Sequence, residues 1–255
     1  MILALGYGFK KQSKIYLMIN SNYEANGRAP YHFNGSSNGY AEAYTDDIGA
    51  QHVGTSYDTP MKPDAFELPD AEKMKQIEGH FREIMDVLGL DLADDSLRGT
   101  PKRVAKMFVQ EIFSGLNPDN KPRISLFDNK FQYRQMLVEK GIRVQSFCEH
   151  HFLPIYGRAH IAYIANGKVI GLSKLNRIVE YYARRPQVQE RLTVQIANEL
   201  KKALGTDDVA VYIDAKHMCV EMRGVQHEHS STVTTEYSGK FLNENTCAEF
   251  LQAIR

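Results

Sequence analysis

The sequence has few cysteines: only Cys148, Cys219 and Cys247 occur in its 255 residues. An odd and low number argues against a secreted domain that is held together by a framework of disulfide bonds. We therefore expect a cytoplasmic protein, whose thiols stay reduced and are available to bind a metal ion.

The sequence also lacks an excess of charge of either sign, because 31 Lys and Arg residues balance 31 Asp and Glu residues. Binding to nucleic acid without sequence preference requires a surplus of positive charge, so we expect no nucleic-acid partner. Long apolar runs are missing as well. No stretch approaches the roughly 18–20 residues that cross a bilayer, and we expect no membrane partner.

Residues 1–65 are expected to form a disordered N-terminal tail. Between residues 21 and 65, Asn, Gly, Ser, Tyr and Asp recur without helical or strand periodicity. Such a segment buries too little apolar surface to offset the entropy that is lost on ordering. We therefore place the folded domain at residues 66–255, with a helical part at 66–118 and a second part at 119–255.

The spacing of apolar residues and the positions of capping and turn residues predict the helices and strands of this domain. Apolar stripes and capping patterns predict helices at 70–88, from Thr100 as N-cap to near Gly115, at 173–183, at 186–204 and from Thr246 onwards. Alternation predicts strands at 155–163, 209–213, 217–222 and 232–237, and Asn166-Gly167 predicts a hairpin turn before Val169 and Ile170. This order favours an α+β fold, an antiparallel sheet with helices on one face, over a doubly wound parallel sheet.

The strongest local signal of chemistry is Cys148-Glu149-His150-His151. The thiolate of Cys148 and the imidazole of His151 are three residues apart and can reach one metal ion, and Cys219 offers a second thiolate. Three such ligands leave the fourth position of a zinc ion open, which is the pattern of catalytic sites. The pKa of water bound in such sites falls to about 7.

A closed structural site is the alternative, with His150 or His217 as the fourth ligand, and spacing alone favours neither interpretation. If these two histidines are not ligands, they are placed to transfer protons, because an unperturbed imidazole titrates near pH 6.5. An isolated histidine, however, is more often an ordinary member of the core.

Cationic residues and a serine recur near expected helix starts, where free N–H groups and the helix dipole attract anions. With one further arginine after Cys219, the set consists of Arg103, Lys106, Ser173, Lys174, Arg177 and Arg223. Together they suit a polyphosphate, although solvated surface charge explains any one of them alone. Glu190 could accept two hydrogen bonds from a guanine base, or could simply be a carboxylate that the helix dipole favours.

Taken together, several segments resemble GTP cyclohydrolase I, and the match extends from about residue 70 to the end of the chain. The matching segments are Leu92 to Leu97, Thr100 to Met107, Glu111 to Leu116, Cys148 to Phe152, Gly171 to Arg177, Arg185 to Thr193, His217 to Cys219 and Arg223 to Val225. Several long motifs in one order are far more specific than any single motif.

The resemblance implies zinc-dependent conversion of GTP to dihydroneopterin triphosphate and formate, on the tunnelling fold at 119–255, in a homodecamer. It implies zinc bound by Cys148, His151 and Cys219, and proton transfer by His150 and His217. It also implies that Gln189 and Glu190 bind guanine. Ser173, Lys174, Arg177 and Arg223 would contact the triphosphate, and Arg103 and Lys106 would reach it from a neighbouring subunit.

Some positions depart from the pattern that we expect of this family, namely Gly99, Glu221, His227 and His229. On a strand, Glu221 would share a face with Cys219 and Arg223 and weaken phosphate binding or pair with a cation. Two rivals make different predictions. A reductase of the same fold needs NADPH and a nucleophilic cysteine in place of this zinc site, and a zinc-stabilised scaffold would have four protein ligands and no GTP turnover.

Overall fold

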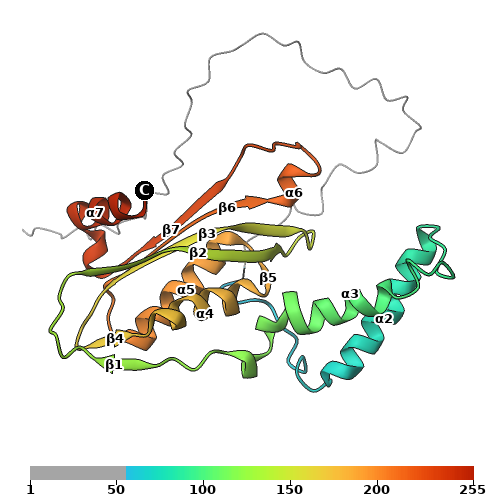
Figure 1. The fold of residues 1–255 in the computed structure, drawn as a ribbon, viewed down its shortest axis with the longest axis horizontal. Helices are drawn as coiled ribbons and strands as arrows, with labels where there is room; N and C mark the ends of the chain where they lie inside the picture. Colours follow the sequence, from blue (N-terminus) through green and yellow to red (C-terminus); the bar gives the residue numbers. More distant parts are fainter. Residues whose placement is uncertain (1–55) are drawn as a thin grey trace, which may run out of the picture. The chain divides into compact units, whose positions relative to one another are not determined.

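The computed structural model describes residues 56–255, so most of the expected tail lies outside the described residues. None of the helices within 56–255 is long and apolar enough to cross a membrane. The α+β class is confirmed: helices precede, cover and follow one main sheet (Figure 1).

The main sheet has five strands in the order β5-β2-β3-β6-β7, and a separate pair joins β1 to β4. All neighbours are antiparallel except β2 and β5, which run parallel. The strands are β1 (Leu126–Asp128), β2 (Met136–Cys148), β3 (Pro154–Ile164), β4 (Lys168–Ile170), β5 (Pro186–Gln187), β6 (Val209–His217) and β7 (Thr232–Tyr237). The strands expected at 155–163, 209–213 and 232–237 are thus confirmed.

One face of the sheet is covered by α4 (Leu172–Ala183) and α5 (Gln189–Leu204), as Figure 1 shows. Alternate residues of β3, such as Ile161 and Tyr163, are fully buried in a core cluster with apolar residues of both helices. Both helices were expected here, but the second begins three residues late. Pro186 and Gln187 form β5 instead, beside the end of β2, and make the junction before α5 part of the sheet.

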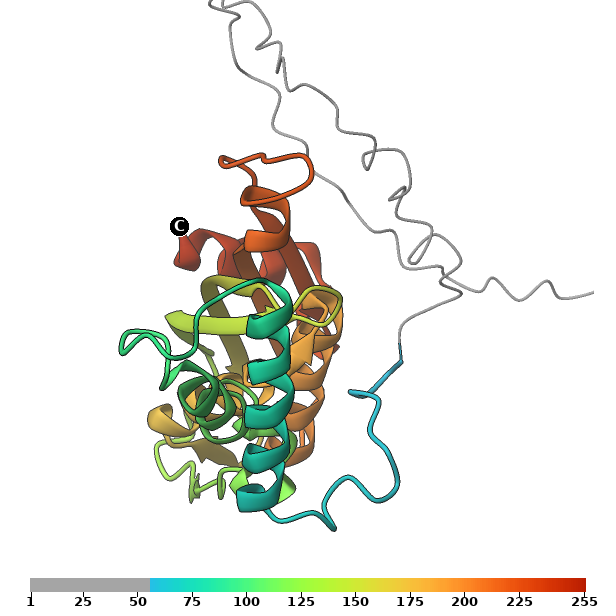
Figure 2. The same cartoon turned by 90° about the vertical axis from the view of Figure 1, so that its right-hand side faces the viewer.

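The sequence predicted that the helices cover one face of the sheet, but in the structure they lie on both faces. Successive residues of a strand point to opposite faces, so Ala162 and Ile164 of β3 face away from α4 and α5. These two residues pack with Phe241 and Phe250, and the latter belongs to α7 (Glu244–Ile254). Figure 2 shows α7, in red, on the other side of the sheet from the orange α5. The expected start at Thr246 was late, because the Asn243 side chain caps the helix.

Before the sheet, the chain forms α2 (Asp70–Val87) and α3 (Thr100–Lys106), which confirms the first two expected helices in their location. Thr100 is inside α3, and Gly99 occupies the N-cap position. The second helix does not remain α-helical to Gly115, because a π-helical segment, η1 (Met107–Ile112), follows α3. Two short 3-10 turns, η2 (Ser114–Leu116) and η3 (Pro118–Asn120), lead towards the sheet.

Gly115 attaches this helical segment to the end of α4. Its backbone N–H donates to the carbonyl oxygen of Arg184 at 3.0 Å. A β-carbon at this position would collide with the backbone carbonyls of Tyr181 and Arg184, so the close approach requires glycine. Phe113 adds edge-to-face ring contacts to Phe147 and Phe152, which lie on either side of the Cys-x-x-His motif.

Two further expectations were wrong. Residues 217–222 do not continue as a strand, because the chain turns into the short helix α6 (Met218–Glu221) after β6. The turn at Asn166-Gly167 exists, and Gly167 has the left-handed φ of 76° that such turns require. It does not close a hairpin, however, since β4 pairs with β1 and not with β3.

Candidate metal centre and active site

Two thiols and one imidazole meet at one end of the main sheet. Potential ligand atoms of Cys148, His151 and Cys219 all lie within 4.8 Å of one another. Strand register explains the meeting. Phe147 pairs with Pro154, and Ile155 pairs with His217, so the last residue of β2 lies close to the turn that follows β6.

A tight turn between β2 and β3 presents the two histidines of the motif. The N–H of Cys148 donates to the Leu153 carbonyl, and the N–H of Phe152 donates to the Cys148 carbonyl, each at 2.8 Å. Phe152 has a φ of 54°, an unfavourable value for an aromatic residue. Its ring contacts with Phe108 and Phe113 help to hold it there. The helical segment thus supports the turn that carries His150 and His151.

The electrostatics of the thiols favour a bound cation. Burial, and then the neighbouring Cys148, raise the pKa of the Cys219 thiol. The Cys148 sulfur lies 3.6 Å from Nδ1 of His150 and 3.8 Å from Nδ1 of His151. Two neighbouring thiolates repel each other in a partly buried place, and a divalent cation removes this penalty by binding both. The donor set of two sulfurs and one imidazole nitrogen therefore fits zinc.

His217 is held beside the thiols by Gln189. Nε2 of His217 lies 2.8 Å from Oε1 of Gln189. The amide nitrogen of Gln189 donates to the carbonyl oxygens of Ile213 and Thr232, at 3.2 and 2.8 Å, so its oxygen must face the histidine. His217 therefore carries its proton on Nε2 when it is neutral, and Nδ1 is its proton acceptor.

The environment of His217 acts on its pKa in two directions. Burial lowers the pKa, and the nearby Glu190 carboxylate opposes this effect by raising it. The charge of Glu190 therefore acts on His217. Gln189 is only 1% exposed and its side-chain amide is engaged within the protein, so the geometry favours a positioning role over direct contact with a base.

Arg223 also reaches the proposed ligands. Its Nη1 lies 2.6 Å from Nε2 of His151, which leaves Nδ1 as the ring nitrogen nearest to the Cys148 sulfur. Glu221 belongs to the helical turn α6, so the expectation that it shares a strand face with Cys219 and Arg223 was wrong. One of its carboxylate oxygens is buried and has no hydrogen-bond partner among the described residues.

Sequence reasoning missed an ion pair next to the ligands. Glu149, between Cys148 and His150, accepts hydrogen bonds from Nη1 and Nη2 of Arg191, both at 2.7 Å. The Arg191 side chain is only 3% exposed. Glu149 belongs to the segment Cys148 to Phe152 and Arg191 to the segment Arg185 to Thr193, but nothing in the spacing of these residues predicts that they pair.

Ser173, Lys174 and Arg177 lie away from this centre. They belong to the first turns of α4, which starts just after β3 and β4, whereas the metal ligands lie where β3 begins. Helix α4 runs from there back toward the metal end, where Pro186 and Gln187 pair with Phe147 and Cys148. Ser173 and Lys174 therefore lie at the end of α4 that is remote from the thiols, and Arg177 lies halfway along the helix. Within one chain, the structure does not bring these residues to the thiols.

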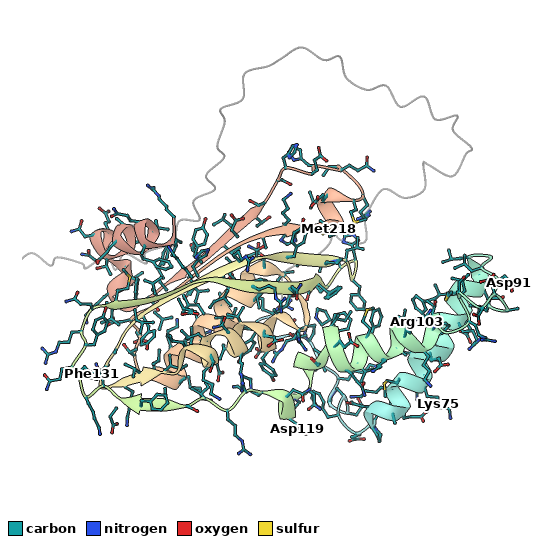
Figure 3. All side chains as sticks on the ribbon, viewed as in Figure 1. Lys75, Asp91, Arg103, Asp119, Phe131 and Met218 are labelled. Carbon is teal, nitrogen blue, oxygen red and sulfur yellow. The ribbon has the colours of Figure 1, made fainter. Side chains whose placement is uncertain are left out.

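Arg103 and Lys106 belong to α3, and Arg103 makes its hydrogen bonds near the start of that helix. Arg103 donates to the hydroxyl of Thr100 at 3.0 Å and to the carbonyl of Ser96 at 3.3 Å. Figure 3 shows Arg103 on α3, apart from Met218, the residue before Cys219. Neither the cations of α3 nor those of α4 therefore form a hydrogen bond with the metal ligands of their own chain among the described residues.

Comparisons with known proteins show the family of the chain. Residues 77–255 match the family model described as GTP cyclohydrolase I. The chain is 58% identical over 214 residues to GTP cyclohydrolase 1 of Flavobacterium johnsoniae, which covers 84% of this chain and 96% of that protein. It is 50% identical over 204 residues to the enzymes of the same name from Enterobacter sp. (strain 638) and Escherichia coli K12, covering 80% of this chain and 92% of each relative. The chain belongs to the GTP cyclohydrolase I family.

Proposed function

We propose that this GTP cyclohydrolase I uses zinc, bound by Cys148, His151 and Cys219, to convert GTP to 7,8-dihydroneopterin triphosphate and formate. The observation that carries the proposal is the convergence of these three side chains within 4.8 Å. GTP as substrate follows from membership of the family. Bound zinc would supply a Lewis acid that lets water ionise near pH 7. The reaction begins pterin and tetrahydrofolate synthesis, and we assign it to the cytoplasm.

His217 is the proposed acid for opening the imidazole ring of the base. Cleavage of this ring requires a proton at N7, and an imidazole is suited to supply it near neutral pH. Gln189 fixes the ring of His217 through Nε2, so proton exchange with the substrate takes place at Nδ1. His150, whose Nδ1 lies 3.6 Å from the Cys148 sulfur, is the second proposed proton carrier.

Glu190 is the proposed partner of the guanine base. Its carboxylate can accept hydrogen bonds from N1–H and from the exocyclic amine, which distinguishes guanine from adenine. Its influence on the pKa of His217 supports a place at the same site. We retain Gln189 in the guanine site as the residue that positions His217 next to the base, in keeping with its buried amide.

The triphosphate is proposed to bind Arg223 of one chain and the cations of other chains. Ser173, Lys174 and Arg177 belong to α4, and Arg103 and Lys106 belong to α3, so none of them shares an element with the metal ligands of its own chain. A shared site therefore requires an oligomer, for which we propose the homodecamer and barrel of the tunnelling fold. Free sheet edges support this proposal. Among the described residues, the outer edge of β7 has no partner strand, and β2 pairs with β5 only at residues 147 and 148.

We keep the proposed division of the domain into a helical part at 66–118 and a tunnelling-fold part at 119–255. Contacts with the domain nevertheless begin before residue 66, because Ser56, Tyr57 and Asp58 form hydrogen bonds with α5. We therefore expect the functional boundary to lie at about residue 55.

Incubation of the purified protein with GTP tests the proposed reaction. We expect stoichiometric formate and a product that becomes a fluorescent pterin on oxidation, with one zinc ion per chain by metal analysis. Removal of zinc with a chelator should stop formate release, and zinc should restore it. Turnover that survives complete removal of the metal would contradict the zinc-dependent mechanism, and absence of formate would contradict the reaction.

A further inference from the structure

Three residues that precede the helical part lie against α5, on the side of the metal centre. The carbonyl of Ser56 accepts a hydrogen bond from Nε of Arg191 at 3.0 Å. A carboxylate oxygen of Asp58 accepts one from Nε2 of Gln195 at 3.1 Å. The hydroxyl of Tyr57 lies 2.5 Å from the side-chain nitrogen of Asn198. We call residues 56–58 the strap.

The first connection from the strap to the metal ligands passes through Arg191. This buried guanidinium uses Nε for Ser56 and uses Nη1 and Nη2 for Glu149. Its planar fork fixes the two partners relative to each other. Loss of the Ser56 carbonyl would leave a buried N–H without its partner and free the guanidinium to rotate. The position of the Glu149 side chain thus depends on the strap.

The second connection passes through two buried glutamines. Gln195, held by Asp58, accepts a hydrogen bond from Nε2 of Gln187 at 2.9 Å. The carbonyl of Gln187 in turn accepts the backbone N–H of Glu149 at 3.0 Å. Gln187 is fully buried and is the β5 partner of Cys148. The strap therefore reaches the backbone at Glu149 as well as its side chain.

We propose that the strap is a positioning device, which holds residues 148–151 in the geometry that binds the metal. Both connections end on Glu149, which stands between the proposed ligand Cys148 and the proposed proton carrier His150. None of the strap residues touches the thiols, so they act through Arg191, Gln195 and Gln187. The part of this inference that concerns metal rests on the proposed function, whereas the part that concerns the backbone at Glu149 does not.

Substitutions at Asp58 in the full-length chain test the device. Asp58→Ala removes the acceptor of the Gln195 amide, while Asp58→Asn keeps an oxygen in its place. Tyr57→Phe is the matched control, because Tyr57 contacts α5 at Asn198, which has no connection to Glu149 through these hydrogen bonds. Deletion of residues 56–58 from the full chain removes both connections together.

The first readout is hydrogen–deuterium exchange of the Glu149 amide in the metal-free protein. We expect exchange to become about 3- to 10-fold faster in Asp58→Ala, in line with the loss of one hydrogen bond. Exchange should be near wild-type in Asp58→Asn and Tyr57→Phe. The deletion should give the largest increase. Unchanged exchange in both Asp58→Ala and the deletion variant would overturn the proposal, as would an equal increase in Tyr57→Phe.

The second readout is the rate at which a chelator removes zinc from the loaded protein. Asp58→Ala should lose zinc several-fold faster than wild-type and Asp58→Asn. The midpoint of thermal unfolding of the metal-free protein should fall by only about 2–4 °C, in line with the loss of one hydrogen bond. If wild-type binds no zinc, the proposed function fails while the exchange result still decides the strap. If zinc leaves all variants at one rate, the strap does not position the ligands.

Discussion

The two ends of the main sheet differ in how complete they are within one chain. At the end where β2 and β6 finish, Cys148, His151 and Cys219 converge, and His217 and Arg223 are already in contact with their neighbours. At the other end, Lys174 lies in the first turn of α4 and has no side-chain hydrogen bond or ion pair among residues 56–255. This difference is the basis of our proposal that one chain builds the metal half of the active site and offers its phosphate-binding half to another chain.

Loss of a thiol at the metal end should have the largest effect. In Cys219→Ser, the hydroxyl is a poor replacement for a thiolate, so we expect loss of bound zinc and of GTP turnover together. Metal analysis after gel filtration, with a formate assay on the same sample, measures both. Cys247→Ser is the control, since Cys247 lies on α7, and it should keep metal and activity. Full zinc occupancy in Cys219→Ser would remove this residue from the ligand set.

The second largest effect is expected for His217, also at the metal end of the sheet, where a substitution can separate metal binding from proton transfer. His217→Ala should retain one zinc ion per chain, but turnover should fall by about 10²- to 10⁴-fold, the usual contribution of a general acid. Gln189→Leu should lower turnover less, because it leaves the imidazole in place but frees its ring. Both variants are compared by kcat at saturating GTP. Release of zinc from His217→Ala would support a closed site with His217 as the fourth ligand.

A smaller effect is expected from the opposite end of the sheet. Lys174→Ala removes a charge from the proposed triphosphate site, so KM for GTP should rise by about 10-fold, in line with loss of one hydrogen bond to a charged group. Zinc content should not change and thermal stability should change little, because Lys174 has no side-chain hydrogen bond or ion pair among residues 56–255. Lys202→Ala, on the exposed side of α5, is the control for loss of a lysine. A wild-type KM in Lys174→Ala would exclude this lysine from the substrate site.

The smallest effect should follow removal of the residues before the strap. Residues 21–50 have the composition of a tail, and the five strands of the main sheet pair with one another within residues 56–255. Deletion of this segment should leave zinc content, oligomer mass and turnover within about two-fold of wild-type, as for other segments that do not pack on a core. Failure of the truncated chain to assemble would show that the segment has a structural function.

The sequence predicted well those structural features that depend on residues close to one another in the chain. The apolar stripe of α2, the alternation of β3 and β6 and the Cys-x-x-His spacing all depend on residues that are close in sequence. Strand β2 was missed because its register shifts between Glu139 and Ile142, which breaks the alternation, and Gly141 there has a φ of 76°. A bulge of this kind removes the period-two signal over an otherwise long strand.

Features that depend on distant pairing were missed or misplaced. Pro186 and Gln187 form a strand only because the end of β2 is available to pair with them. The Glu149–Arg191 ion pair and its link to Ser56 join three separate segments, and no spacing rule connects them. The candidate ligands were nevertheless found, because their chemistry is rare in combination.

Complementation between two impaired chains tests the shared site most directly. Cys219→Ser lacks the metal half and Lys174→Ala weakens the phosphate half, so each alone should turn over GTP slowly at low substrate. If the halves come from different chains, co-refolding should create some sites with an intact half from each variant, about a quarter of the total for random mixing in a symmetric oligomer. Activity at low GTP should then exceed the average of the two separate samples. No gain in mixed oligomers confirmed by mass would show that one chain supplies both halves.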